Sequence, residues 1–257
     1  MRRREFITLV GGAVTALPFA VRAQQPALPV IGLMGVDNAA SQSRMTAAFV
    51  QRLRELGWTE GRNVIIEYRW AEGRTERFAE IAAEFVQRNV SIILTHNTPP
   101  TLAAKQATSV IPIVFATAGD PVETGLVSSL ARPGGNVTGL SSQASDIVGK
   151  RLELLRQAVP GLRRLATIAD IGNPWAAFDL SVTKDAARTL GIEVTSFEIG
   201  RPEEIDSVFG ALKGLQTRCM FCMCHCYLPT GYASLVWRLT RAYQHYASFE
   251  NTSKRAL

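Results

Sequence analysis

Short apolar runs alternate with longer amphipathic segments along most of the chain, from residue 28 to residue 214. The short runs are rich in Val, Ile and Leu and end at glycine or polar residues, which is typical of buried strands. In the longer segments an apolar residue returns every three or four positions, which predicts helices that bury one face. We expect strands at residues 28–35, 63–70, 91–96, 111–117, 136–141, 163–170 and 192–200, and helices at 43–57, 74–90, 99–108, 147–161, 173–191 and 201–214.

This alternation predicts the fold class. Strand–helix–strand units with short connections form parallel sheets that are covered by helices on both faces. The series starts twice, and the junction falls near residues 141–150. We therefore expect an α/β protein with two lobes. The expected division is an export signal at 1–23, a first lobe at 24–145, an incomplete second lobe at 146–214 and an aberrant tail at 215–257.

The N-terminal segment has the layout of an export signal. A basic start precedes an apolar stretch, and small residues around Ala23 fit a cleavage site. Residues 3–7, RREFI, also resemble the twin-arginine export motif. A membrane-anchor helix is the alternative, but the apolar stretch contains Pro18 and two glycines and is shorter than the roughly 20 residues that a span needs. We predict export, which in a bacterium means the periplasm.

The net charge of +6 comes from the two ends of the chain. Residues 1–23 contribute +3 and residues 215–257 contribute +4, so the residues between them sum to −1. A nearly neutral body lacks the basic surface that nucleic-acid binding requires. The apolar fraction of 47% and the charged fraction of 19% are those of a soluble globular protein. We therefore expect no nucleic-acid partner.

Small polar residues, prolines and glycines follow the predicted strands. In parallel α/β sheets, ligands bind at the carboxyl ends of the strands, where backbone N–H groups and helix N-termini point outward. These groups suit hydrogen bonding to a small organic solute. Asp120-Pro121 and Asn173-Pro174 also fit helix capping, with proline at the first helical position. The loops in question are residues 36–42, 96–100, 117–121 and 141–142, with Asp170, Asn173 and Pro174 in the second lobe.

Motifs for nucleotide or phosphate binding are missing from the sequence. The pattern GxxxxGK(S/T) does not occur, and Gly32 and Gly35 have the wrong spacing for GxGxxG. Between residues 24 and 214 there is one histidine, His96, and no cysteine. Ser141 and Ser142 stand outside any GxSxG context. These observations favour a binding protein over an enzyme, and we expect no cofactor and no catalytic residues.

Three stretches resemble the substrate-binding proteins of ABC transporters, in the subfamily that includes aromatic-amino-acid binders. They are AFVQRLRELGWTEGRNVIIEYRWAEGRTERFAEIAAEFV (48–86), HNTPPTLAAKQATSVIPIVFAT (96–117) and GDPVETGLVSSLARPGGNVTGLSS (119–142). The resemblance runs from about residue 28 to residue 214. It implies a type I periplasmic-binding fold, in which two α/β lobes close on a solute by a hinge and then dock on an ABC permease in the inner membrane.

The resemblance also implies which residues contact the solute. An amino-acid ligand needs an anion for its ammonium group, and Asp120 is the candidate. The family usually places a further acidic residue after the next strand of the second lobe, and this chain lacks that segment. The resemblance implies a monomer without a cofactor or metal site. By position, the ligand-binding residues are Asn38, Thr98, Pro99, Asp120, Pro121 and Ser141 in the first lobe and Asn173 and Pro174 in the second.

All four cysteines lie at residues 219–226, CMFCMCHC, with His225 among them. A zinc or iron–sulfur site is one interpretation, but structural zinc sites usually take ligand pairs from two separated segments. Disulfides are a second interpretation, since an exported protein permits them, but here they close only very small loops. We favour a frameshift. The last 43 residues hold four of the five tyrosines but only one acidic residue and one glycine, an abrupt change after Gly214.

The sequence therefore predicts the solute-binding component of an ABC importer, with an incomplete second lobe. Such a protein captures a small organic solute, amino-acid-like in this subfamily, and performs no chemistry itself. An exported α/β enzyme acting on a small polar substrate is the first alternative, and a turnover assay separates it from a receptor. A non-functional frameshifted product is the second.

Overall fold

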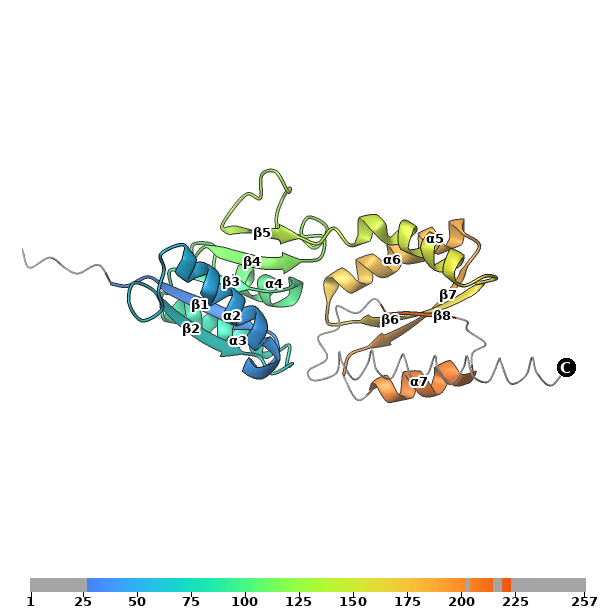
Figure 1. The fold of residues 1–257 in the computed structure, drawn as a ribbon, viewed down its shortest axis with the longest axis horizontal. Helices are drawn as coiled ribbons and strands as arrows, with labels where there is room; N and C mark the ends of the chain where they lie inside the picture. The colour runs from blue at the N-terminus through green and yellow to red at the C-terminus, as the bar shows by residue number, and fades with distance from the viewer. Residues whose placement is uncertain (1–26, 202–203, 215–218, 223–257) are drawn as a thin grey trace, which may run out of the picture.

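The computed structural model describes residues 27–201, 204–214 and 219–222. It consists of two α/β lobes side by side, each built on a parallel sheet (Figure 1). The predicted export signal at residues 1–23 lies outside the described residues, and so does most of the tail that begins at residue 215. The two parallel sheets with flanking helices confirm the fold class that the alternation predicts.

The first sheet has five parallel strands in the order β2-β1-β3-β4-β5. Because all strands are parallel, their carboxyl ends share one edge, and the loops that follow them gather there. The helices α3 and α4 pack against each other beside this sheet. The elements are β1 (Val30–Gly35), α2 (Ala39–Glu55), β2 (Ile65–Trp70), α3 (Arg77–Gln87), β3 (Ile92–Thr95), α4 (Thr98–Ala107), β4 (Ile113–Ala118) and β5 (Val137–Ser141).

The second sheet has three parallel strands among the described residues, in the order β7-β6-β8. In Figure 1, α5 and α6 lie on one side of this sheet and α7 lies on the other. The short helix η2, which the sequence pattern did not predict, connects the two lobes. The elements are η2 (Ser145–Ile147), α5 (Val148–Ala158), β6 (Arg164–Asp170), α6 (Pro174–Thr189), β7 (Glu193–Ile199), α7 (Ile205–Gly214) and β8 (Cys219–Cys222).

The strand β8 lies within the predicted aberrant tail. It pairs in parallel with β6, with Cys219 opposite Leu165 and Cys222 opposite Ile168. This is the place where strand–helix alternation predicts a strand after α7. A regular strand therefore stands within the segment that we expect to be an aberrant tail. The remainder of the tail lies outside the described residues, so the frameshift interpretation stays a prediction.

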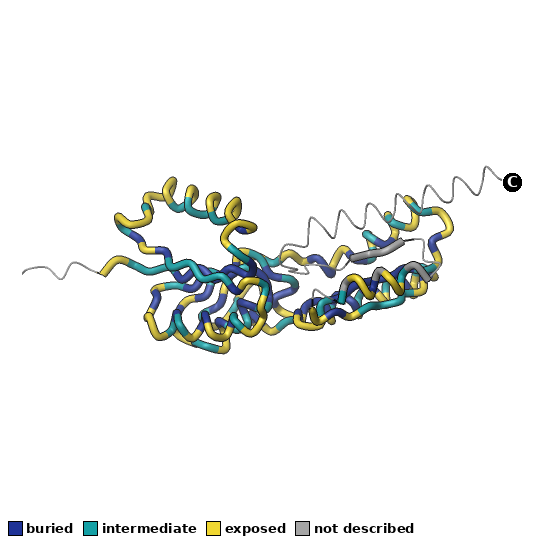
Figure 2. The backbone as a smooth tube through the Cα atoms, turned by 90° about the horizontal axis from the view of Figure 1, so that it is seen from below, coloured by how far each residue is buried: buried dark blue, intermediate teal, exposed yellow. Residues whose placement is uncertain are grey.

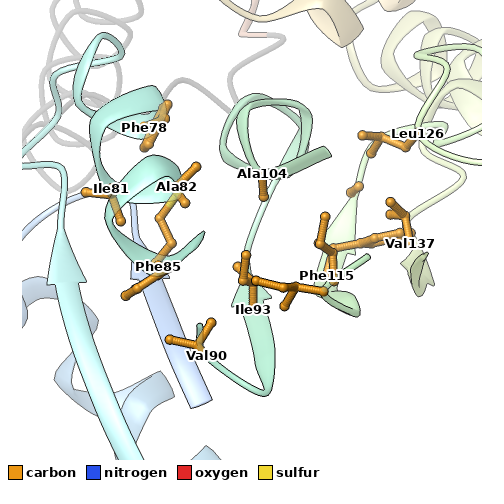
Figure 3. Close-up of a cluster of buried hydrophobic side chains, with 14 of the residues drawn as sticks. Phe78, Ile81, Ala82, Phe85, Val90, Ile93, Ala104, Phe115, Leu126 and Val137 are labelled. Atoms are coloured by element: carbon orange, nitrogen blue, oxygen red, sulfur yellow. The ribbon is translucent and has the colours of Figure 1, made fainter. Parts of the chain in front are cut away.

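One face of α3 fills the core of the first lobe. Phe78, Ile81 and Phe85 are buried, as their spacing predicts, and Figure 3 shows them along α3 with Phe85 nearest to Ile93. The ring of Phe85 lies directly on Gly32 of β1, because a Cβ atom at that position would come within 2.8 Å of Phe85 Cδ2. Glycine at this point of β1 therefore lets the helix approach the sheet closely.

By contrast, α2 exposes much of the apolar face that its sequence predicts. Met45 is 49% exposed and Leu56 is 60% exposed. Gln42 is the buried residue of this helix, and most of the helix is exposed in Figure 2. The cover of the first sheet is therefore uneven, with the α3–α4 face packed and the α2 side more accessible.

Candidate functional site

A cavity opens between the two lobes at the carboxyl ends of their strands. It encloses about 390 Å³ of empty space, part of which is open to solvent. The first lobe lines it with residues that follow β1, β2 and β3, and the second lobe lines it with the loop after β6. This is the edge at which parallel α/β sheets bind ligands. The lining residues are Val36, Gly73, Thr75, Phe78, Asn97, Pro99, Pro100, Asp170, Gly172 and Asn173.

Asn97 stands at the point where β3 turns into α4. Its backbone N–H donates to the carbonyl of Thr117 at 2.8 Å, and its own carbonyl accepts from the hydroxyl of Thr101. Its φ angle of 78° lies in the left-handed region, which asparagine tolerates better than most residues. The side chain is 5% exposed, and Nδ2 has no hydrogen-bond partner among the described residues. Buried amides are almost always paired, so this one is available for a ligand.

Asp170 ends β6 and faces the cavity from the second lobe. Its Oδ1 accepts a hydrogen bond from the backbone N–H of Gly172 at 2.8 Å, which fixes the carboxyl group. Burial raises the pKa of Asp170, and the hydrogen bond from Gly172 offsets part of that rise. Asn173 follows and caps α6, because its Oδ1 accepts from the backbone N–H of Trp175 at 3.1 Å.

Four buried side chains join the lobes beside the cavity, and we call Asp120, Ser145, Trp175 and Asp179 the interlobe cluster. The indole Nε1 of Trp175 donates to Asp120 Oδ2 at 2.6 Å. The hydroxyl oxygen of Ser145 lies 2.6 Å from Asp120 Oδ2 and 2.8 Å from Asp179 Oδ1. A hydroxyl has one hydrogen, so it donates to one of these carboxylates at a time. Asp120 keeps the Trp175 hydrogen bond in either case.

The interlobe cluster also depends on the backbone before Asp120. A Cβ atom at Gly119 would lie 2.4 Å from Trp175 Cγ, so the indole ring packs directly on this glycine. Asp120 itself has a φ angle of 30°, a left-handed conformation that is uncommon outside glycine. Strained backbone of this kind persists only where neighbouring groups hold it. Here Trp175 of α6, in the other lobe, packs on Gly119 and donates to Asp120.

The eight predicted binding residues fall into three groups. Pro99 and Asn173 line the cavity. Thr98 and Asp120 are buried near it: the Thr98 hydroxyl lies 3.5 Å from the Gly119 carbonyl oxygen, and Asp120 belongs to the interlobe cluster. The other four serve local structure: Asn38 caps α2, Pro121 accepts from Leu126 N–H in the following turn, Ser141 accepts from Gln143 N–H, and Pro174 is the exposed first residue of α6.

Eight of the ten lining residues were not among the eight predicted ones, and Asn97 and Asp170 are the two with a side-chain amide or carboxyl group. Asn97 and Asp170 directly follow or end predicted strands, which is the sequence signal that marks them. The resemblance pointed by position to their neighbours Thr98 and Asn173, although both also fit a helix-capping pattern. The sequence does not show which of two adjacent polar residues caps a helix and which one faces a ligand.

A family model with the description "ABC transporter substrate binding protein" matches residues 36–244, which is most of the chain. The chain belongs to this family. This confirms the resemblance noted in the sequence. A curated relative, the tyrosine-binding protein of Clostridioides difficile (strain R20291), is 30% identical over 184 residues. The match covers 72% of this chain and 53% of the relative, so the chain spans about half the length of that protein.

Solved structures show the same fold. A conserved domain protein from Vibrio cholerae superposes with a TM-score of 0.73 at 24% identity, covering 84% of this chain and 71% of that one. A Streptococcus pneumonia protein in complex with L-Trp superposes with a TM-score of 0.70 at 21% identity, covering 81% of this chain and 68% of that one. The ligand-free, open structure of a substrate-binding protein from Clostridium difficile superposes with a TM-score of 0.53 at 27% identity, covering 76% of this chain and 65% of that one. The architecture is the type I periplasmic-binding fold.

Among the described residues, no helix is both long and apolar enough to cross a bilayer. The same part of the chain holds no cluster of three or more His, Cys, Asp or Glu that could bind a metal ion. Cys224, His225 and Cys226 lie outside it, so the metal and disulfide interpretations of the cysteine-rich segment stay untested predictions.

Proposed function

We propose that this protein is the solute-binding component of an ABC importer and encloses a small organic solute between its two lobes. One observation carries the proposal: the cavity is lined by strand-end loops from both lobes, with polar groups from each. Closure of two lobes on a solute removes it from water and lets both lobes hydrogen-bond to it. The expected division at 24–145 and 146–214 places each side of the cavity in a different lobe.

An amino-acid-like solute is the best candidate. The curated relative is named a tyrosine-binding protein, and one structural neighbour holds L-Trp. The cavity wall supports this choice, because Phe78, Pro99 and Pro100 offer apolar surface beside the polar groups of Asn97 and Asp170. The partner is a permease of the inner membrane, and the place of action is the periplasm, reached through the N-terminal signal.

The alternative of an exported enzyme has less support. Among the ten residues that line the cavity, none is a histidine, cysteine, serine or lysine, so no nucleophile–base pair faces it. Asp170 and Thr75 both line the cavity, but in the described part of the chain no hydrogen bond joins their side chains. A receptor needs only complementary polar groups and an apolar wall.

Wild-type protein is expected to show one cooperative thermal transition that rises by about 5–10 °C with L-tyrosine or L-tryptophan at roughly 100 times Kd. A ligand at that excess stabilises the folded state by about 2.7 kcal/mol, and each kcal/mol shifts the midpoint of a protein this size by about 2–4 °C. Differential scanning calorimetry measures the shift, with D-ribose as a control solute that lacks both ammonium group and aromatic ring.

The alternatives give different results in the same experiment. Conversion of the added solute, followed by NMR of the mixture, indicates an enzyme. Absence of a cooperative transition indicates the non-functional product. A cooperative transition that no amino acid shifts contradicts the proposed solute class.

A further inference from the structure

The cavity contains one ionisable side chain among its described lining residues, and that side chain is an acid. Asp170 stands alone there, because no Lys, Arg or His lines the same space. Its Oδ1 is held by Gly172, and Oδ2 makes no hydrogen bond among the described residues. A half-buried carboxylate without a cationic partner is costly, and a ligand that brings a positive charge removes that cost.

From the first lobe, Asn97 faces the cavity with a hydrogen-bond donor that needs an acceptor. Its Nδ2 is a buried donor without an acceptor, on a side chain that is 5% exposed. Leaving such a donor unpaired costs roughly 1–3 kcal/mol, which a ligand oxygen recovers. Backbone hydrogen bonds to Thr117 and Thr101 hold Asn97 at its φ of 78°, so its position is set before a ligand arrives.

Asp120, the acid that the sequence suggested for this role, is already occupied. Its Oδ2 lies 2.6 Å from both Trp175 Nε1 and the Ser145 hydroxyl oxygen, and it does not line the cavity. Both donors belong to the protein and connect the lobes. The charge of Asp120 is therefore used within the interlobe cluster.

We propose, on the basis of the function proposed above, that Asp170 binds the primary ammonium group of the solute while Asn97 Nδ2 donates to an oxygen acceptor on the same solute. The apolar part of the solute lies against Phe78 and Pro99. The two polar contacts come from different lobes, so one solute molecule connects them across the cavity. Burial raises the pKa of Asp170 because it disfavours the carboxylate, and a bound ammonium group stabilises that carboxylate.

The test compares three probes of the same ring structure: L-tyrosine, tyramine, which lacks the carboxylate, and 3-(4-hydroxyphenyl)propionate, which lacks the ammonium group. Isothermal titration calorimetry is expected to show that the wild type binds L-tyrosine and tyramine but binds the propionate at least tenfold more weakly. Asp170→Asn is expected to weaken L-tyrosine binding about 10- to 100-fold, the range for a charge-assisted hydrogen bond. Asp185→Asn, on the exposed surface of α6, is the charge-matched control and should leave Kd unchanged.

Two further variants separate binding from folding. Asn97→Gly removes the amide and keeps a residue that adopts positive φ, so a loss of about 2- to 10-fold in L-tyrosine affinity reports the hydrogen bond. Ligand-free Asp170→Asn should unfold at the same temperature as the wild type or higher at pH 7. Burial raises the pKa of Asp170 in the folded protein above its unfolded value. At a pH above both values, the folded protein therefore bears a charge that burial disfavours, and Asp170→Asn removes that charge.

The outcomes distinguish this inference from the function on which it rests. If the wild type binds L-tyrosine and Asp170→Asn binds it equally well, the assignment of Asp170 is wrong and the receptor function stands. Equal wild-type affinity for L-tyrosine and the propionate overturns the assignment in the same way. Folded wild type that binds neither L-tyrosine nor tyramine contradicts the proposed amino-acid-like solute class and, with it, the assignment of Asp170.

Discussion

Trp175→Ala is expected to lower the free energy of unfolding by about 3–5 kcal/mol, the range for removing a buried tryptophan. Trp175 is 3% exposed and connects the lobes in two ways. Its ring packs on Gly119, where a Cβ atom would lie 2.4 Å from Cγ, and its Nε1 donates to Asp120 Oδ2 at 2.6 Å. The substitution leaves a cavity on α6 and takes one donor from a buried carboxylate.

Urea unfolding followed by circular dichroism at 222 nm measures this loss. Trp58→Ala is the matched control, because Trp58 is 44% exposed, and it should change stability much less. Trp175→Phe keeps most of the ring and removes the N–H, so it isolates the hydrogen bond and should cost about 1–3 kcal/mol. A loss below 1 kcal/mol in Trp175→Ala would mean that the interlobe cluster does not hold the lobes together.

The elements of this fold were predictable because their signals are local. The apolar spacing of Phe78, Ile81 and Phe85 predicts α3 and its buried face, and the structure buries all three. The apolar run around Ile93 predicts β3 in the same way. Strand–helix alternation then predicts parallel sheets, since short crossovers leave few other arrangements. The series starts twice, which predicts two lobes, and the family resemblance added the type I periplasmic-binding fold.

The site was less predictable because its contacts are not local. Asp120 has the sequence context of a helix cap, and nothing near it indicates the hydrogen bond to Trp175, 55 residues later. Asn97 and Thr98 are adjacent polar residues after β3, and only the backbone conformation places Asn97 at the cavity. The strand β8 was not predicted because its composition, CMFC, differs from that of the other strands. The strand–helix alternation does predict a strand at this position, after α7.

Phe85→Ala is expected to destabilise the protein by about 3–5 kcal/mol. Phe85 is 0% exposed and lies between α3 and β1, in the cluster that Figure 3 shows. The substitution opens a cavity at a place that the rigid strand beneath cannot fill. The same urea experiment measures it, and Leu140→Ala, at a position that is 70% exposed, is the control from the same lobe. Equal effects of the two substitutions would contradict the packing described for α3.

A double-mutant cycle with Gly32 tests the geometry of this contact. In the wild type, Gly32→Ala places a Cβ atom 2.8 Å from Phe85 Cδ2, and overpacking of this kind costs about 1–3 kcal/mol. In the Phe85→Ala background the same methyl group enters the cavity that the ring has left, so its cost should vanish or become a gain. The two substitutions therefore have an interaction free energy of about 1–3 kcal/mol in the favourable direction. Additive effects would show that the Phe85 ring does not rest on Gly32, and the close approach of α3 to β1 would then need another cause.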